Sequence, residues 1–119
     1  IASEYIGIDI NDSIYADKKA DAAELPFPDR SFDVALSTQA LEHIIEYQSA
    51  VDEMHRVLKN DGIAFLSTHG VMEVHGAPHD YWRFTQYGLK EVFKNFKEVV
   101  IINNGGAILC LFMILNTAK

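Results

Sequence analysis

The chain has 119 residues, of which 49% are hydrophobic and 23% are charged, and its formal net charge is −7. This length suits one domain, the composition is that of a folded protein, and the acidic charge disfavours nucleic acid as a main partner. The single cysteine, Cys110, excludes an internal disulfide and favours a reducing, cytoplasmic location. The longest apolar run, residues 107–115, is shorter than the ~20 residues that span a bilayer, so we expect no membrane partner.

The first third of the chain is predicted to hold short strands joined by turns. Residues 5–10 form a β-rich run that ends in acidic and polar residues, and a short strand is expected near residues 18–20. Residues 22–31 contain two prolines and an Asp-Arg-Ser turn, which favours a loop with one helical turn at most. Residues 32–37 are nearly continuously apolar, as expected of a strand covered on both faces.

The rest of the chain alternates helical and extended patterns. From residue 41 the apolar period is that of a helix, and Gly62 is expected to end this helix as a left-handed cap. Residues 63–67 and 98–102 are predicted strands. Thr85 is predicted to cap an amphipathic helix between them. For residues 107–116 a helix is favoured over a strand.

Strands that alternate with helices predict a parallel α/β sheet with right-handed crossovers. In such sheets, ligands bind beyond the carboxyl ends of the strands. The residues to inspect are therefore Asp9, Asp21, residues 37–40 and the loop after Ser67.

Several segments, taken in order, carry a family resemblance. They are residues 5–10 (Tyr-Ile-Gly-Ile-Asp-Ile), 21–33 (Asp-Ala-Ala-Glu-Leu-Pro-Phe-Pro-Asp-Arg-Ser-Phe-Asp), 41–43 (Leu-Glu-His), 53–62 (Glu-Met-His-Arg-Val-Leu-Lys-Asn-Asp-Gly) and 79–85 (His-Asp-Tyr-Trp-Arg-Phe-Thr). In this order and spacing, the chain resembles the class I, Rossmann-like S-adenosylmethionine-dependent methyltransferases, especially the small-molecule group called methyltransferase type 11. The resemblance implies S-adenosyl-L-methionine as cofactor and a small-molecule methyl acceptor as partner.

One part of the family pattern is not found in the chain. No Gly-x-Gly turn precedes Tyr5, although the family's first strand carries one so that the backbone can approach the cofactor. We therefore expect a single partial methyltransferase domain over residues 1–119, cut from a longer sequence. Its fold is expected to be an incomplete Rossmann-like α/β sheet without the first central strand and the last antiparallel strand.

This incompleteness has consequences for function. We expect the chain as given to bind cofactor weakly, and its exposed strand edges to favour a homo-oligomer. The alternative is a non-catalytic, methyltransferase-like interaction or scaffold domain. A nucleotide-binding dehydrogenase fragment is disfavoured by residues 21–32 and 56–62.

The resemblance also assigns cofactor-binding residues. A carboxylate at a strand end can accept hydrogen bonds from both ribose hydroxyls, and Asp9 stands at that position, with Ile10 beside it for the adenine face. The position of Asp21 binds the adenine amino group in the family, and the backbone of Ala22 adds a contact. The plain alternatives are a turn residue for Asp9 and a solvated acid for Asp21. The methionine part and the substrate border are assigned to Ser37, Thr38 and Gln39.

Catalytic and substrate-binding residues are expected on the same side of the sheet. Imidazole titrates near neutral pH, so His43 or His79 is the candidate for proton removal. The expected substrate contacts are His69, Asp80, Trp82 and Arg83. Trp82 suits a substrate floor or core packing equally, and Arg83 suits either an anionic substrate group or a protein carboxylate such as Asp80.

The same loop raises the possibility of a metal. His69, His75 and His79 lie close together in sequence with Glu73 and Asp80 among them, and imidazole and carboxylate suit zinc or iron. Their spacing matches no compact metal motif, so the sequence assigns no metal.

Overall fold

The structure is a computed structural model that describes residues 3–106, so the helix predicted over residues 107–116 lies outside the described residues. Two compact units make up the chain, and each consists of two segments. The first unit is Ile1–Ala35 with Glu46–Ala64, and the second unit is Leu36–Ile45 with Phe65–Lys119. Within the described residues, no helix is long and apolar enough to cross a membrane.

A small parallel sheet opens the first unit. Its strands are β1 (Ile8–Asp9) and β2 (Lys18–Lys19), with Ile8 opposite Lys18 and Asp9 opposite Lys19. The strand near residues 18–20 is therefore confirmed, whereas the strand predicted over residues 5–10 is shorter than expected. The strand does not extend through Gly7, because the Gly7 N–H donates to the Asp17 side-chain carboxylate at 2.7 Å and not to a backbone carbonyl of a neighbouring strand.

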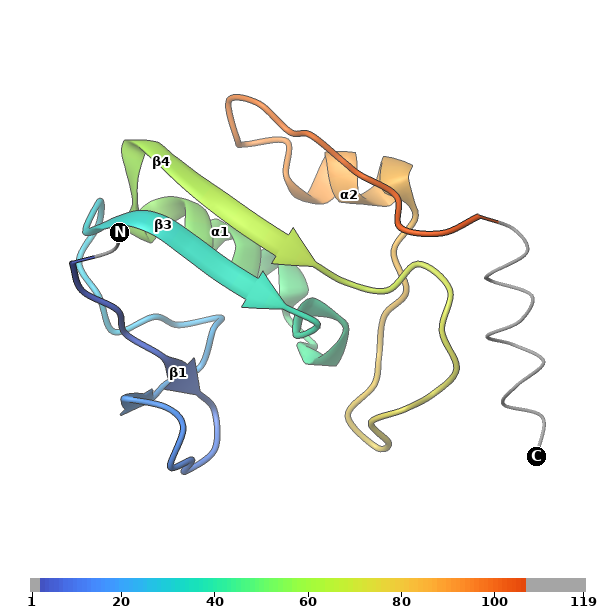
Figure 1. Ribbon diagram of the computed structural model, residues 1–119, viewed down its shortest axis with the longest axis horizontal. Coiled ribbons are helices and arrows are strands. Elements are labelled where there is room, and N and C mark those ends of the chain that lie inside the picture. The colour runs from blue at the N-terminus through green and yellow to red at the C-terminus, as the bar shows by residue number, and fades with distance from the viewer. Residues whose placement is uncertain (1–2, 107–119) are drawn as a thin grey trace. The chain divides into compact units, whose positions relative to one another are not determined.

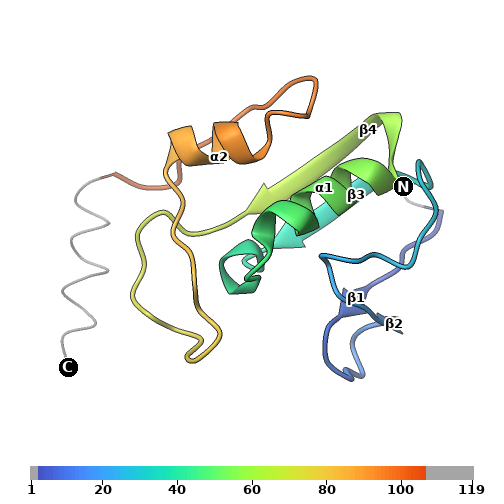
Figure 2. The same cartoon turned by 180° about the vertical axis from the view of Figure 1, so that it is seen from behind.

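The central element is a β-α-β unit. The strands β3 (Phe32–Thr38) and β4 (Leu58–Ser67) pair with each other, and α1 (Tyr47–Val57) connects them. Both strands point the same way and α1 lies along one face of the pair (Figures 1 and 2). The chain thus has the predicted α/β class and a partial Rossmann-like sheet with parallel strands.

Burial alternates along β3 from Val34 and along β4 from Asp61, because successive side chains point to opposite faces. On the face of α1 the core contains Val51, Val57 and Leu58, which are 2%, 3% and 6% exposed. The opposite face leaves large apolar side chains exposed, namely Val34, Leu36, Ile63 and Phe65. The expectation that residues 32–37 are covered on both faces is therefore met on one face only, among the described residues. The homo-oligomer stays a prediction.

The helix α1 ends differently from the sequence-based expectation. It stops at Val57, and Leu58 already has an extended backbone with ψ of 138°. Gly62 lies within β4, so its predicted role as the left-handed cap is wrong. The physical reason is that the backbone N–H groups of Arg30 and Ser31 donate to the carbonyls of Arg56 and Val57 at 3.0 and 2.8 Å. These bonds satisfy carbonyls that a glycine cap would otherwise serve.

The second unit contains two short helices besides the ends of β3 and β4. The 3-10 helix η1 (Leu41–His43) replaces the start of the long helix predicted from residue 41. The helix α2 (Gln86–Val92) has the predicted cap, since the Thr85 hydroxyl accepts a hydrogen bond from the Gly88 N–H at 3.1 Å.

The strand predicted over residues 98–102 is not formed. Its side chains Val100 and Ile102 are 74% and 81% exposed. A β-rich segment needs a neighbouring strand for its backbone hydrogen bonds, and no described strand pairs with it.

Candidate functional site

The carboxyl ends of β3 and β4 are joined by Gln39. Its backbone has a left-handed φ of 52°, its N–H donates to the Ser67 carbonyl at 2.9 Å, and its Nε2 donates to the Ser67 hydroxyl at 2.9 Å. Ser37 and Thr38 are the last residues of β3. The three residues predicted to border the methionine part thus form the strand end and the turn after it, where ligands bind in parallel α/β sheets.

The following turn, η1, buries a carboxylate. The side chain of Glu42 is 0% exposed, and its Oε2 accepts a hydrogen bond from the Thr68 hydroxyl at 2.7 Å. Its Oε1 has no hydrogen-bond partner among the described residues, and the His69 Nε2 lies 3.4 Å from it. The burial of Glu42 could not be predicted, because burial of a loop carboxylate has no local sequence signal.

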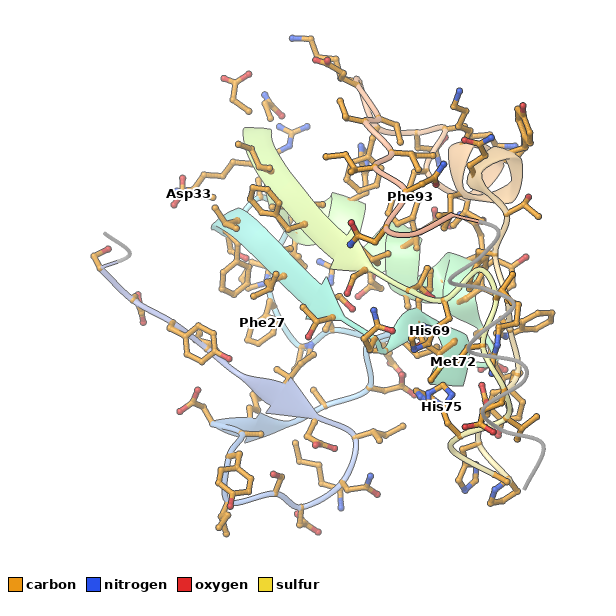
Figure 3. All side chains as sticks on the ribbon, turned by 45° about the vertical axis from the view of Figure 1, so that its right-hand side comes forward. Phe27, Asp33, His69, Met72, His75 and Phe93 are labelled. Atoms are coloured by element: carbon orange, nitrogen blue, oxygen red, sulfur yellow. The ribbon has the colours of Figure 1, made fainter. Side chains whose placement is uncertain are left out.

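Three histidines gather beside this carboxylate. The ring centroids of His43 and His75 are 4.9 Å apart, and those of His69 and His75 are 5.1 Å apart (Figure 3 labels His69 and His75). The His43 Nδ1 contacts the carbonyl of His79. The ring of His79 itself bonds elsewhere, with its Nδ1 2.9 Å from the Tyr81 hydroxyl. Of the two predicted catalytic histidines, the structure therefore places His43 in the cluster and the His79 side chain beside Tyr81.

Asp80 and Arg83 form a bidentate ion pair. The Asp80 Oδ1 and Oδ2 accept from the two terminal nitrogens of Arg83 at 2.6 and 2.8 Å, and Oδ2 also accepts from the His75 N–H at 2.9 Å. The hydrogen bonds from Arg83 hold the pKa of the Asp80 carboxyl well below its usual range, against the opposing effect of burial. The same pairing raises the pKa of Arg83.

The remaining donors of Arg83 are also engaged. Its guanidinium donates to three carbonyl groups at 2.6 to 3.0 Å, those of Met72, Glu73 and Trp82. The sequence left two partners open for Arg83, an anionic substrate group or a protein carboxylate. In the structure its partner is the carboxylate of Asp80, and the other guanidinium bonds tie together carbonyl groups of the loop.

The loop over residues 79–85 is bonded to η1. The backbone N–H groups of Tyr81 and Trp82 donate to the Glu42 carbonyl at 2.9 and 3.2 Å, and the Trp82 indole donates to the Ile44 carbonyl at 3.0 Å. Trp82 remains 37% exposed. This side chain therefore packs on one side and keeps a surface for a ligand, so both of its predicted roles stay open.

The predicted nucleotide side lies in the first unit. The Asp9 Oδ1 accepts from the Asn11 N–H at 2.8 Å, and the Asp21 Oδ1 accepts from the Ala23 N–H at 2.8 Å. Each carboxylate is thereby held in a turn with its second oxygen unbonded among the described residues. Ile10 is 61% exposed. The assignment of Asp9 and Ile10 to the ribose and the adenine stays a prediction.

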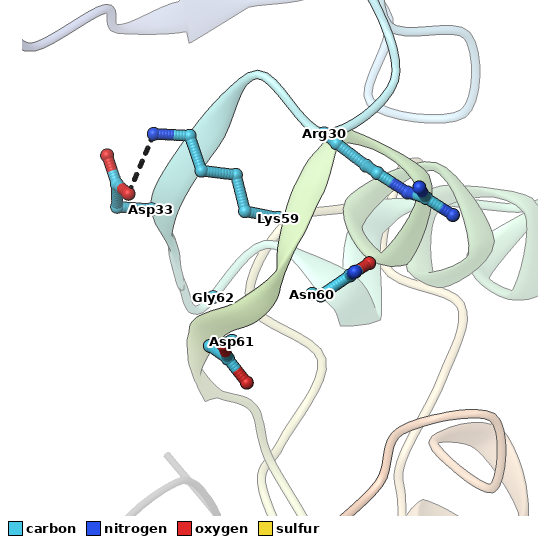
Figure 4. A pocket seen from close by; sticks show the side chains of 6 residues that line it. All are labelled: Arg30, Asp33, Lys59, Asn60, Asp61 and Gly62. Carbon is cyan, nitrogen blue, oxygen red and sulfur yellow. Dashed lines mark hydrogen bonds and ion pairs between the residues drawn. The ribbon is translucent and has the colours of Figure 1, made fainter.

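A polar hollow lies elsewhere in the first unit, near the amino ends of β3 and β4 (Figure 4). Within it, the Lys59 ammonium lies 2.8 Å from the Asp33 carboxylate, and both side chains are exposed. The hollow includes none of the predicted site residues.

Comparison with known proteins identifies the family. A family model described as a methyltransferase domain matches residues 2–66, which is more than half of the chain. The chain belongs to this methyltransferase family. The cofactor of the family is S-adenosyl-L-methionine. The matched residues include Asp9, Asp21 and the turn at Gln39, whereas the loop that carries His69 and His75 follows them.

Individual relatives agree with this assignment. The chain is 33% identical over 78 residues to a probable S-adenosylmethionine-dependent methyltransferase of Mycolicibacterium smegmatis, covering 57% of this chain and 30% of the relative. It is 46% identical over 48 residues to the uncharacterized methyltransferase YcgJ of Bacillus subtilis, covering 40% and 19%. It is 44% identical over 43 residues to the ubiquinone/menaquinone biosynthesis C-methyltransferase UbiE of Citrifermentans bemidjiense, covering 36% and 18%.

A solved structure shares the fold. The [4+2]-cyclase SpnF superimposes with a TM-score of 0.56 and 31% sequence identity, covering 66% of this chain and 30% of that chain. The chain thus spans about 30% or less of the length of these relatives. Because this neighbour is named as a cyclase, the shared fold does not by itself define the reaction.

Proposed function

We propose that residues 1–119 are one partial domain of a protein that transfers a methyl group from S-adenosylmethionine to a small-molecule acceptor. The observation that carries the proposal is the match to the methyltransferase domain over residues 2–66. It is supported by the two carboxylates that the matched segment holds in turns after short strands, Asp9 and Asp21.

The cofactor would be held chiefly by these carboxylates. The free Oδ2 of Asp9 would accept from the ribose hydroxyls, and exposed Ile10 would cover the adenine face. Asp21 and the backbone of Ala22 would contact the adenine amino group. Ser37, Thr38 and Gln39 would border the methionine part, because they end a parallel strand where ligands bind.

Methyl transfer from S-adenosylmethionine requires little acid–base catalysis by the protein. Bound S-adenosylmethionine supplies a methyl group that its sulfonium has already activated. The protein must align the acceptor atom with that methyl group and exclude water. As the bond from the methyl group to the acceptor formed, its bond to the sulfonium sulfur would break, S-adenosylhomocysteine would leave, and the acceptor would lose its proton to His43 or His79. Both histidines have a ring nitrogen engaged with an acceptor or a hydroxyl, which orients the ring.

The acceptor side would be formed by the loop that follows β4. Trp82 offers a partly exposed ring, and His69 stands next to the buried Glu42. The Asp80–Arg83 pair would act by holding this loop in place, since its hydrogen bonds are made within the loop. Both residues would thus define the shape of the acceptor site.

A calorimetric titration with S-adenosylmethionine tests the proposal. We infer that the 119-residue chain binds weakly, because no Gly-x-Gly turn precedes Tyr5, and that a chain extended upstream in its reading frame binds more tightly. If the extended chain does not bind, the enzyme assignment fails and the scaffold alternative is favoured. Release of S-adenosylhomocysteine in the presence of candidate acceptors must accompany binding, since a cyclase shares this fold.

A further inference from the structure

We propose that Glu42, His43 and His75 bind a divalent cation of the zinc class. One ligand atom from each of these side chains can be chosen so that all three lie within 4.8 Å of one another. They come from η1 and from the loop after β4, both in the second unit. The sequence assigned no metal, and it considered His75 only together with its neighbours in the loop, because the approach of that loop to η1 is a product of the fold.

The first support is the state of Glu42. Its side chain is fully buried, and one of its two carboxylate oxygens has no hydrogen-bond partner among the described residues. A buried carboxylate is costly unless it is paired or coordinates a metal. The lone hydrogen bond from Thr68 orients the group and leaves Oε1 as the atom for the cation.

The second support is the hydrogen bonding of the two histidines. The Nδ1 of His43 contacts the His79 carbonyl, which can only accept, so this nitrogen carries the proton and the lone pair lies on Nε2. The Nδ1 of His75 lies 3.3 Å from the Glu73 carbonyl and 3.4 Å from the Asp80 carboxylate. Metal-bound histidines commonly donate their other ring N–H to a carbonyl or a carboxylate in this way.

The ligand types define the class of cation. Two imidazoles and one carboxylate suit Zn²⁺ and neighbouring transition metals, whereas Mg²⁺ and Ca²⁺ prefer oxygen ligands throughout. Three protein ligands leave a further position open for water or for an oxygen of a bound molecule. With His43 on the cation, His79 is the histidine left for proton removal in the proposed methyl transfer.

An ion pair between Glu42 and His69 would explain the buried carboxylate without a metal, and it predicts that the cluster does not bind transition metals. A protonated His69, whose Nε2 lies 3.4 Å from the Glu42 Oε1, would neutralise the carboxylate without a metal. The cluster would then be a buried ion pair beside histidine rings that meet edge to face, and it would show no saturable affinity for transition metals.

Cobalt titration of the tag-free, chelator-treated 119-residue chain separates the two. We expect saturable binding of one Co²⁺ per chain with d–d absorption in the visible range, reversed by Zn²⁺. His75→Ala and Glu42→Gln should each weaken binding about tenfold or more. The matched control, His55→Ala, removes a histidine of α1 in the first unit and should leave binding unchanged.

Two results would overturn the proposal. One is the absence of saturable binding by the wild-type chain with a folded circular dichroism spectrum. The other is an equal loss of affinity in His55→Ala and His75→Ala, which would indicate dispersed surface histidines. If the buried Glu42→Gln variant does not fold, the more exposed His75→Ala decides alone. The titration contains no S-adenosylmethionine, so its outcome is independent of the proposed methyl transfer.

Discussion

Gln39 bonds Ser67 twice, through its backbone N–H to the Ser67 carbonyl and through its side-chain Nε2 to the Ser67 hydroxyl, both at 2.9 Å. These bonds join the end of β3 to the end of β4. They also hold Gln39 in a left-handed conformation, with φ of 52°, that a residue with a side chain adopts rarely. The predicted methionine border is therefore a constrained turn, and its conformation depends on a bond to the neighbouring strand.

A double-mutant cycle tests this constraint. Gln39→Ala removes the side-chain bond and should lower the free energy of unfolding by about 1 kcal/mol, as a typical intramolecular hydrogen bond does. Ser67→Ala removes the same bond from the other side, so the double variant should lose little more than either single variant. Urea unfolding measures all three, with Thr38→Ala as the control for the loss of a neighbouring strand-end side chain. Fully additive losses would show that the two side chains do not interact.

The approach of Gly76 to His43 makes a second prediction. A Cβ at Gly76 would lie 2.7 Å from Cε1 and 3.1 Å from Nδ1 of the His43 ring, so the ring must move in Gly76→Ala. We expect this variant to weaken cobalt binding in the titration above, because the bond from His43 to the His79 carbonyl is lost. The matched control is Gly88→Ala in α2, whose Cβ meets only Thr85 Oγ1 at 3.4 Å. Unchanged cobalt affinity in Gly76→Ala would argue against His43 as a ligand.

The carboxylate of Glu53 predicts a pH dependence of stability. Its two oxygens accept from Arg56 at 2.6 and 2.7 Å, and Oε2 also accepts from the Leu25 N–H at 2.7 Å. Hydrogen bonding to Arg56 lowers the pKa of Glu53 from 4.5, although burial opposes the shift. Since the unfolded chain then binds the proton more tightly, the stabilisation is present above pH 4.5 and is lost as the pH falls through the folded pKa.

Glu53→Gln isolates this contribution. We expect it to cost about 1.5 to 3 kcal/mol at neutral pH, as for hydrogen bonds to a charged group, and less as the pH is lowered. The measurement is the difference in unfolding free energy between wild type and variant, followed from neutral to acid pH. Asp80, whose pKa is also lowered, is present in both proteins, so its contribution to the pH dependence cancels in this difference. Glu91→Gln, which changes an exposed pair with Lys94 at 3.9 Å, serves as the control. A difference that does not change with pH would contradict the role of Glu53.

The sequence could predict elements whose signal is local. The apolar run of β3, the helical period of α1 and the Thr85 cap each depend on neighbouring residues, and each is found in the structure. The end of α1 could not be predicted, because distant N–H groups at Arg30 and Ser31 satisfy its last carbonyls. The strand at residues 98–102 failed for a related reason, since a β-rich pattern forms a strand only beside a partner.

In the candidate site, too, features with a local sequence signal were predictable and features that depend on distant residues were not. The order and spacing of motifs were enough to indicate the family and its cofactor, because those motifs are short and contiguous. The convergence of Glu42 with His43 and His75 was not predictable, because it requires the loop after β4 to return to η1. Adjacent Glu and His residues in a turn before a histidine-rich loop are the only signal that could have suggested it.

The last prediction concerns Asp9 as the ribose ligand. In the upstream-extended chain, Asp9→Asn keeps an acceptor for the Asn11 N–H but loses the charge that would bind the ribose hydroxyls. Affinity for S-adenosylmethionine should fall about tenfold or more, since hydrogen bonds to a charged group contribute about 1.5 to 3 kcal/mol. The control, Asp12→Asn, removes an acid of the same loop whose pair with Lys19, at 2.9 Å, is exposed. Calorimetry should show unchanged affinity for this control, because exposed ion pairs contribute little. Equal losses in both variants would instead indicate a general effect of the negative charge of this loop, and Asp9 would then be only a turn residue.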